Sequence, residues 1–257
     1  MISNPELSVE SINLHLQNKC IIKNMSFVLP EGKISAIIGP NGSGKSTILK
    51  ILCNILQPTS GTAYLNKKSI KLYRQKEIAK YISFLPQHPI VPDNYKVIDI
   101  LHAGRFPHQG ILNRVSANDI DVIEWALKMT ELENYKNVLM HHLSGGLRQR
   151  AWLAMTLCQE TPIIILDEPT TYLDIKHQLQ LIQLIKRLNA EYKKTILWVL
   201  HDLNQAILSS DYLFIFKNGE ILNSGRPSDI IKSGALTSIF DVYINKNYFQ
   251  QHISLLN

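Results

Sequence analysis

The sequence predicts an α/β fold: a core of mixed β-sheet with flanking helices, an antiparallel β-sheet near the N-terminus and an inserted helical block. Apolar runs of strand length alternate with helical patterns, which is typical of βα units. Three of these runs are mainly apolar, namely KISAIIG (33–39), PIIILD (162–167) and TILWVL (195–200). Such strands are buried on both faces, as in a parallel sheet covered by helices.

The runs near the two ends of the chain have a different pattern. LSVESINLHL (7–16) and GTAYLN (61–66) are short and alternating, and they predict an antiparallel β subdomain at the N-terminal end. YLFIFKNGEILNSG (212–225) has Asn218-Gly219 between two β-rich runs, which predicts a hairpin.

The middle of the chain is predicted to be helical. We interpret residues 88–158 as a helical subdomain inserted into the core, with residues 1–257 forming a single domain. DIDVIEWALKM (119–129) has acidic residues in its first turn and lysine in its last, as the helix dipole favours. A further helix is predicted over residues 176–188, with one apolar face made of Leu179, Ile182, Ile185 and Leu188.

Size and composition are those of a globular protein. The 257 residues are 45% hydrophobic and 19% charged, and their net charge of +6 suits an anionic ligand, a membrane surface or simple solubility. The three widely spaced cysteines favour a reducing compartment. The N-terminus has no signal-peptide pattern, and no apolar run approaches the roughly 20 residues that cross a bilayer. We therefore expect a soluble, cytoplasmic chain.

A glycine-rich stretch, GPNGSGKST (39–47), matches the phosphate-binding pattern G-x-x-x-x-G-K-[ST] and lies between an apolar strand and a helix-like run. Its glycines let successive backbone N–H groups converge on phosphate oxygens, next to the positive end of the following helix. We expect Lys45 to neutralise the β- and γ-phosphates and the Ser46 hydroxyl to ligate Mg²⁺. The residues expected to contact the nucleotide are Gly39, Pro40, Asn41, Gly42, Ser43, Gly44, Lys45, Ser46 and Thr47.

Polar side chains follow three other apolar runs. Asp167 ends the strand 162–167, where its carboxylate can hold Mg²⁺, and Glu168 comes next, where a general base for water attack would lie. His201 follows the strand 195–200 and could contact the γ-phosphate and the attacking water. Gln87 follows YISFLP (81–86) and could reach the metal and the water.

Taken together, these motifs resemble the ABC ATPase family over nearly the whole chain. In that family's terms, 39–46 is the Walker A motif, Gln87 the Q-loop glutamine, 163–167 with Glu168 the Walker B motif, and His201 the switch histidine. The signature is LSGG, with Ser144, Gly145 and Gly146, and the D-loop ends at Asp174. Because these matches are independent and occur at the family's spacing, they are much more specific than a phosphate loop alone.

The resemblance implies a mechanism. Two copies would pack head to tail, with ATP and Mg²⁺ between the phosphate loop of one and the LSGG of the other. Glu168 would activate water, Gln87 and His201 would organise the γ-phosphate, and Asp174 would link the two sites. The dimer would close on ATP and open after hydrolysis. The helical block would transmit this motion to an integral-membrane permease, and an extracytoplasmic substrate-binding protein would take part indirectly.

Three sequence segments resemble, more narrowly, the ATPases of importers for ferric siderophores, haem and cobalamin. These segments are GRFPHQG (104–110), LRQRAWLAM (147–155) and DEPTTYLDIKHQ (167–178). The expected function is the ATP-hydrolysing subunit of such an importer, at the cytoplasmic face of the membrane. Two positions depart from the family pattern. Leu16, beside His15, stands where an aromatic residue stacks on adenine, and Leu147 stands where glutamine is common in the signature.

Other functions fit the sequence less well. A GTPase-type switch would need N-K-x-D and D-x-x-G, and the sequence has neither. An ABC ATPase acting on DNA or ribosomes usually carries a long coiled coil or a second ATPase module, and the modest charge here predicts no nucleic-acid partner. Only the resemblance of these three segments to importer ATPases argues against an ABC exporter subunit. Five histidines are candidates for metal handling, but their spacings match no ligand pattern and favour surface positions: His88, His102, His108, His141 and His142.

Overall fold

The computed structural model of this protein describes residues 5–17, 19–90, 94–110, 115–171, 173–234 and 236. The chain forms two compact units. The first unit comprises Met1–Tyr73 and Thr195–Asn257, and the second comprises Arg74–Lys194. Within the described residues, no helix combines the length and the apolar character needed to span a membrane.

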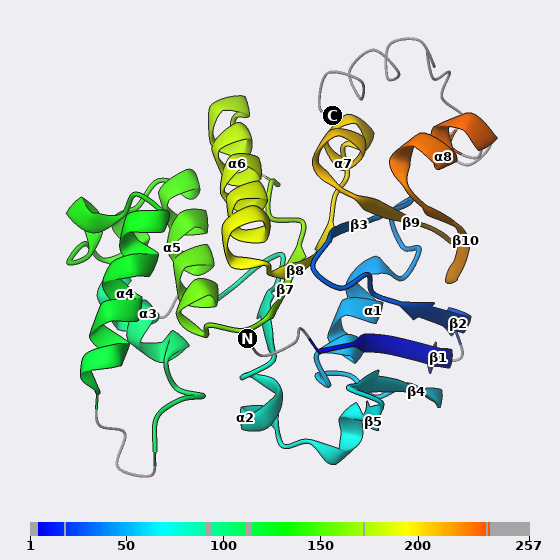
Figure 1. The fold of residues 1–257 in the computed structure, drawn as a ribbon, viewed down its shortest axis with the longest axis horizontal. Helices are drawn as coiled ribbons and strands as arrows, with labels where there is room; N and C mark the ends of the chain where they lie inside the picture. The colour runs from blue at the N-terminus through cyan, green and yellow to red at the C-terminus, as the bar shows by residue number, and fades with distance from the viewer. Residues whose placement is uncertain are drawn as a thin grey trace. The chain divides into compact units, whose positions relative to one another are not determined.

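The first unit contains the antiparallel sheet that was predicted at the N-terminal end. Its strand order is β2-β1-β4-β5, and all of its pairings are antiparallel. The four strands are β1 (Leu7–Leu16), β2 (Lys19–Val28), β4 (Ser60–Leu65) and β5 (Lys68–Ser69), drawn in blue and cyan in Figure 1. Apolar side chains of β1 such as Leu7, Ile12 and Leu14 are fully buried, whereas Glu10 and His15 are exposed. These apolar side chains therefore lie on the face of the sheet that is covered by the core, and the exposed polar ones lie on the other face.

The first unit also contains a mixed sheet, in which β3 (Ile34–Ile38) pairs in parallel with β8 (Thr195–Val199) on one side and with β9 (Tyr212–Lys217) on the other. β10 (Glu220–Gly225) pairs antiparallel with β9. The predicted hairpin turn is confirmed, since Asn218 and Gly219 have φ values of 52° and 83°, which suit a tight turn between twisted strands. The helices of this unit are α1 (Lys45–Leu52), α7 (Leu203–Ser209) and α8 (Pro227–Ser233), with the 3₁₀ turn Ile70–Leu72.

The second unit combines a parallel strand pair with helices. β6 (Ile82–Leu85) pairs in parallel with β7 (Ile163–Asp167), and both are mainly buried. The helices are α2 (Gln75–Ile78), α3 (Val97–Gly104), α4 (Ala117–Met129), α5 (Gly145–Cys158) and α6 (Ile175–Tyr192), with 3₁₀ turns at Glu133–Tyr135 and Met140–His142. Helices α3, α4 and α5, in green in Figure 1, pack on one another and lie within residues 88–158. The α/β class predicted from the sequence, with its mixed sheet, antiparallel sheet and helical block, is therefore confirmed.

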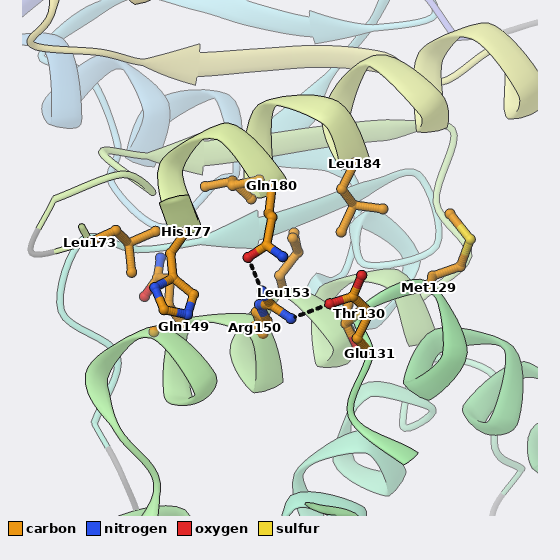
Figure 2. A pocket seen from close by; sticks show the side chains of 12 residues that line it. Met129, Thr130, Glu131, Gln149, Arg150, Leu153, Leu173, His177, Gln180 and Leu184 are labelled. Carbon is orange, nitrogen blue, oxygen red and sulfur yellow. Dashed lines mark hydrogen bonds and ion pairs between the residues drawn. The ribbon is translucent and has the colours of Figure 1, made fainter. Parts of the chain in front are cut away.

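The helix predicted over residues 176–188 is present as α6, and its apolar face was predicted in part: Ile185 and Leu188 are buried, as expected, but Leu179 is not. The buried positions are Leu181, Ile185 and Leu188, at i, i+4 and i+7, whereas the side chain of Leu179 is 55% exposed. Successive residues of a helix are about 100° apart, so positions separated by three residues fall about 60° short of a full turn. Over nine residues such a row moves to the opposite side of the helix. Figure 2 shows the side of α6 that faces α5, with Gln180 bonded to Arg150.

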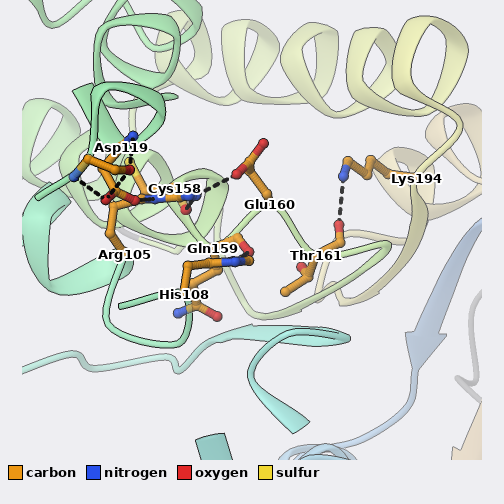
Figure 3. Close-up of polar contacts among 9 residues, drawn as sticks. Arg105, His108, Asp119, Cys158, Gln159, Glu160, Thr161 and Lys194 are labelled. Carbon is orange, nitrogen blue, oxygen red and sulfur yellow. Dashed lines mark hydrogen bonds and ion pairs between the residues drawn. The ribbon is translucent and has the colours of Figure 1, made fainter. Parts of the chain in front are cut away.

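A buried arginine ties α3, α4 and α5 together (Figure 3). Arg105, which follows α3, is 1% exposed. Its Nε donates to Asp119 Oδ1 at 2.7 Å, and its Nη1 donates to the Cys158 carbonyl and to Glu160 Oε2, each at 2.6 Å. Asp119 lies in the first turn of α4 and also accepts from the backbone N–H of Ser116, the N-cap residue, at 2.8 Å. The arginine therefore neutralises a buried acid and satisfies the carbonyl at the end of α5.

The pKa of Asp119 follows from these contacts. Burial by itself would raise the pKa of this carboxyl, but the hydrogen bonds from the Ser116 backbone and the Arg105 side chain outweigh burial and lower the pKa to about 2. The group is therefore a permanent anion at neutral pH, and a buried anion needs its cation.

We expect Arg105→Met to destabilise the protein by about 3–5 kcal/mol, because it leaves a buried carboxylate without its cation and a carbonyl without its donor. Arg105→Met keeps most of the apolar stem, so the loss reports the guanidinium and not the packing. Urea unfolding, monitored by circular dichroism, measures this change. A cost below about 1 kcal/mol would contradict the role given to Arg105, and Arg187→Met, at an exposed pair on α6, serves as the control.

Candidate nucleotide-binding and hydrolysis site

The predicted phosphate loop joins β3 to α1 in the first unit. Gly44 is the N-cap residue of α1 and has φ = 97°, in the left-handed region that favours glycine. Gly39 lies so close to β9 that a Cβ on it would be 2.2 Å from the carbonyl oxygen of Phe216. The loop therefore needs glycine at both positions of its sequence pattern, for two different steric reasons.

Lys45, the first residue of α1, closes the loop. Its side chain is buried, with the residue 5% exposed, and its Nζ donates to the carbonyl oxygens of Gly39 at 2.9 Å and Pro40 at 3.0 Å. These bonds span the loop from its last residues to its first. They hold the ammonium group in the concave side of the loop, where a phosphate would lie.

Ser43 has a feature that fits an anionic ligand. Its residue is 3% exposed, and its hydroxyl has no hydrogen-bond partner among the described residues. A buried hydroxyl without a partner is costly and rare in native proteins. Because Ser43 lies in the loop, the oxygen of a bound phosphate could accept a hydrogen bond from its hydroxyl. The loop therefore fits a nucleotide phosphate chain.

His201 lies at the same edge of the first unit's mixed sheet as the phosphate loop. In the parallel pair β3–β8, Ile37 is aligned with Val199, and the N–H of Leu200 donates to the Ile37 carbonyl at 3.2 Å. Two residues beyond this aligned pair come Gly39 on one strand and His201 on the other. The exposed His201 is thereby placed beside the start of the loop.

Gln87 and Glu168 are brought together by the same rule in the second unit. In the parallel pair β6–β7, Leu85 is aligned with Leu166, and two residues further on are Gln87 and Glu168. Gln87 Nε2 donates to Glu168 Oε2, and the Thr171 hydroxyl donates to the same oxygen at 3.4 Å. Asp167, the last residue of β7, is 2% exposed. The sequence predicted both side chains but not the bond between them.

The backbone of Glu168 is held in an unusual conformation. Its φ is 52°, in the left-handed region, although it is not a glycine. Such a residue costs about 1–3 kcal/mol and persists where surrounding contacts fix it, often at functional sites. Glu168 is 7% exposed, and it lines a pocket together with Gln87, Thr171 and Gly145. The carboxylate is thus buried, oriented and adjacent to open space.

The signature residues begin α5. Ser144 is its N-cap residue, whose hydroxyl accepts from the Leu147 N–H at 3.4 Å, and Gly145 and Gly146 are the first two helical residues. The first turn has no acidic residue. The N-terminal end of α5 therefore presents backbone N–H groups and a hydroxyl, which suit an anion.

Asp174 is the N-cap residue of α6. Its Oδ1 accepts from the backbone N–H of His177 at 2.9 Å and from His177 Nδ1 at 2.7 Å, and its side chain is 65% exposed. These two hydrogen bonds hold the pKa of the Asp174 carboxyl below its usual range. The sequence predicted Asp174, whereas the bond from His177 carries no sequence signal.

The predicted metal ligands are oxygen donors of the kind Mg²⁺ prefers: the Ser46 hydroxyl, the Gln87 amide and the Asp167 carboxylate. Ser46 belongs to the first unit, and Gln87 and Asp167 belong to the second. The bond from Gln87 to Glu168 uses the amide nitrogen, so the amide oxygen is the atom that suits a cation. In the described part of the chain, no group of three or more His, Cys, Asp or Glu side chains could hold a metal ion.

Comparison with known proteins identifies the family. A family model described as ABC transporter matches residues 22–171. The chain belongs to the ABC transporter family. The iron(3+)-hydroxamate import ATP-binding protein FhuC of Bacillus subtilis (strain 168) is 42% identical over 236 residues, which cover 92% of this chain and 88% of that protein.

Similarity to two further proteins supports this assignment to the family. The ferric enterobactin transport ATP-binding protein FepC of Escherichia coli (strain K12) is 38% identical over 231 residues, covering 90% of this chain and 85% of that protein. The dimeric structure of MJ0796, a bacterial ABC transporter cassette, has a TM-score of 0.77 at 29% identity and covers 86% of this chain and 98% of that one. The predicted family, the fold class and the prediction of an ATPase are therefore confirmed.

We expect Lys45→Ala to weaken ATP binding by about 10- to 100-fold, because it removes a charge-assisted bond to phosphate and the two bonds that close the loop. Titration with a fluorescent ATP analogue measures the Kd. Lys50→Ala, on an exposed position in the last turn of the same helix, is the matched control and should bind as wild type does. Equal affinity of Lys45→Ala and wild type would contradict the assignment of this loop.

Proposed function

We propose that this protein is the ATP-hydrolysing subunit of an ABC importer that powers the uptake of a ferric siderophore through a membrane permease. The observation that carries this proposal is the similarity, over about nine tenths of the chain, to ATP-binding proteins of iron(3+)-hydroxamate import and ferric enterobactin transport. The two named cargoes differ from each other chemically but both are chelates of ferric iron. The shared chemistry supports the class of cargo and leaves its identity to experiment.

The phosphate loop is proposed to bind the ATP phosphates through residues 39–47. Support comes from the buried ammonium of Lys45, from the buried Ser43 hydroxyl that awaits an acceptor, and from the N-terminal end of α1. Ser46, Gln87 and Asp167 would hold Mg²⁺. When bound, this ion neutralises phosphate charge and stabilises charge that develops during phosphoryl transfer.

Glu168 is proposed to orient and deprotonate the attacking water. The buried carboxylate is held by Gln87 and Thr171 and lines a pocket, so it can accept a proton from a water molecule in that pocket. His201 and Gln87 are proposed to position the γ-phosphate and the water. The positions of both residues, two beyond an aligned strand pair, support these roles.

A second copy of the chain is proposed to complete each site, in a head-to-tail dimer. Ser144, Gly145 and Gly146 of one copy would meet the γ-phosphate held by the other, and Asp174 would link the two sites. The dimeric structure of the related cassette MJ0796 supports the dimer. The acid-free first turn of α5 supports its part in binding an anion.

We further propose that residues 1–257 act as one ABC-type domain in which residues 88–158 are the inserted helical subdomain. That subdomain would contact the permease at the cytoplasmic face of the membrane, and an extracytoplasmic substrate-binding protein would deliver the cargo. The packing of α3, α4 and α5 around Arg105 supports a helical block that moves as a unit.

We expect Glu168→Gln to bind ATP with wild-type affinity but to hydrolyse it at least about 100-fold more slowly, because the amide cannot accept a proton. It should also accumulate an ATP-bound dimer on size-exclusion chromatography, whereas wild type does not. Glu133→Gln, at an exposed acid in the second unit, is the control for a charge change. Hydrolysis by Glu168→Gln at the wild-type rate would contradict the assignment of the base.

Uptake by a strain that lacks this gene tests the cargo. We expect loss of the uptake of an iron-labelled siderophore, restoration by the wild-type gene, and no restoration by Glu168→Gln. Parallel assays with a hydroxamate, a catecholate, haem and cobalamin identify the cargo class, and uptake of an unrelated amino acid is the control. Loss of haem or cobalamin uptake alone would overturn the siderophore assignment, and unchanged uptake of every cargo would overturn the importer.

A further inference from the structure

His177 touches two of the proposed functional motifs at once. It lies in the first turn of α6, and its ring faces the first turn of α5 near Gln149 (Figure 2). A Cβ built on Gly146 would be 3.1 Å from His177 Cδ2, 3.2 Å from Cγ and 3.3 Å from Nε2. These distances are shorter than ordinary van der Waals contact, so the ring packs against the bare backbone of the signature glycine.

The other side of the same ring fixes the Asp174 carboxylate. His177 Nδ1 lies 2.7 Å from Asp174 Oδ1. An ionised carboxylate only accepts hydrogen bonds, so His177 Nδ1 carries a hydrogen and donates a hydrogen bond to Asp174 Oδ1. The backbone N–H of His177 donates to the same oxygen at 2.9 Å. Asp174 is thereby held in one orientation while most of its side chain stays open to solvent.

A second polar contact joins the same two helices one turn further along. Arg150, four residues after Gly146, donates to Gln180 Oε1, three residues after His177. The guanidinium also donates to Glu131 Oε2 at 2.8 Å. Between and beside these contacts lies a pocket lined by Leu153, Leu181 and Leu184, among others (Figure 2). The contacts of Arg150 thus join α5 to α6 beside this hollow.

We propose that His177 is a positioning residue that holds the signature glycine Gly146 and the D-loop carboxylate Asp174 in fixed relation within one chain. The inference rests on the proposed function, in which both motifs face the nucleotide site completed by a second copy. His177 itself contacts neither ATP nor metal. It orders the surface that the second copy meets, so its loss slows hydrolysis without weakening the binding of ATP to the phosphate loop of the same chain.

Three substitutions of His177 separate its two contacts. His177→Phe keeps a ring against Gly146 and loses the donor to Asp174, His177→Asn keeps an N–H donor and loses the ring, and His177→Ala loses both. We expect kcat for ATP hydrolysis by the complete transporter to fall about tenfold in His177→Ala, as loss of one hydrogen bond and a contact implies. The Phe and Asn variants should each fall less.

The measurements are kcat with the assembled transporter, Kd for ATP with the isolated chain, and the thermal midpoint of unfolding. Only kcat should change, and Gln183→Ala, on an exposed position of α6, should match wild type in all three. A wild-type kcat in all three His177 variants would overturn the inference, and so would an equal loss of ATP affinity. A wild-type transporter without ATPase activity would instead overturn the proposed function, and the inference with it.

A double-mutant cycle tests the direct contact. In wild type, the Cβ of Gly146→Ala would lie 3.1 Å from the imidazole and the ring would have to shift by a few tenths of an ångström, whereas His177→Ala removes the ring. We therefore expect Gly146→Ala to lower kcat by a smaller factor in His177→Ala than in wild type. Gly145→Ala is the matched control, because a Cβ there meets no described atom within 4 Å, and its effect should be the same in both backgrounds. Equal effects of Gly146→Ala in both backgrounds would overturn the contact.

Discussion

The register of two parallel strand pairs is the constraint on which the site depends. In a parallel pair, both chains leave the sheet at the same edge, so residues equally far beyond an aligned pair become neighbours. In the first unit this brings Gly39 and His201 to one edge, and in the second it brings Gln87 and Glu168 into a hydrogen bond. A shift of one residue in either pair would reverse the faces of these side chains. The buried apolar strands thus serve function by fixing where the polar residues after them lie.

Several charged side chains of this protein are buried, which is costly unless each has a partner. Lys45, Asp167, Glu168 and Arg105 are all less than one tenth exposed, and a buried charge persists only with partners. Arg105 has its partners within the second unit and is satisfied without a ligand. Lys45 donates to the carbonyl oxygens of Gly39 and Pro40 in the phosphate loop, where a bound phosphate would accept a stronger, charge-assisted hydrogen bond. Arg105 therefore has a structural role, whereas the place of Lys45 in the phosphate loop suits a ligand.

Much of the fold and of the site could be predicted, because their signals are local in sequence. The apolar runs, the glycine loop and the residues after each strand are contiguous patterns, and the structure has strands, loop and side chains at those positions. The buried face of α6 was predicted correctly at Ile185 and Leu188 but not at Leu179, because positions three apart drift around a helix with 3.6 residues per turn. Only the neighbouring elements decide which side of the helix is covered. The partners of Arg105, and the approach of His177 to Gly146, are brought about by folding, and no run of residues encodes them.

The two adjacent glycines of the signature have different reasons for lacking a side chain. Around Gly145 there is open space, and it lines the same pocket as Glu168, so a side chain there would occupy the approach of a ligand and not strike the protein. Gly146 faces the ring of His177, whose nearest atom would lie 3.1 Å from a Cβ at that position. One glycine keeps the helix N-terminus open to an anion from outside, and the next leaves room for the histidine ring that is hydrogen-bonded to Asp174. A single pair of residues thereby connects the surface offered to a second copy with the carboxylate beside it.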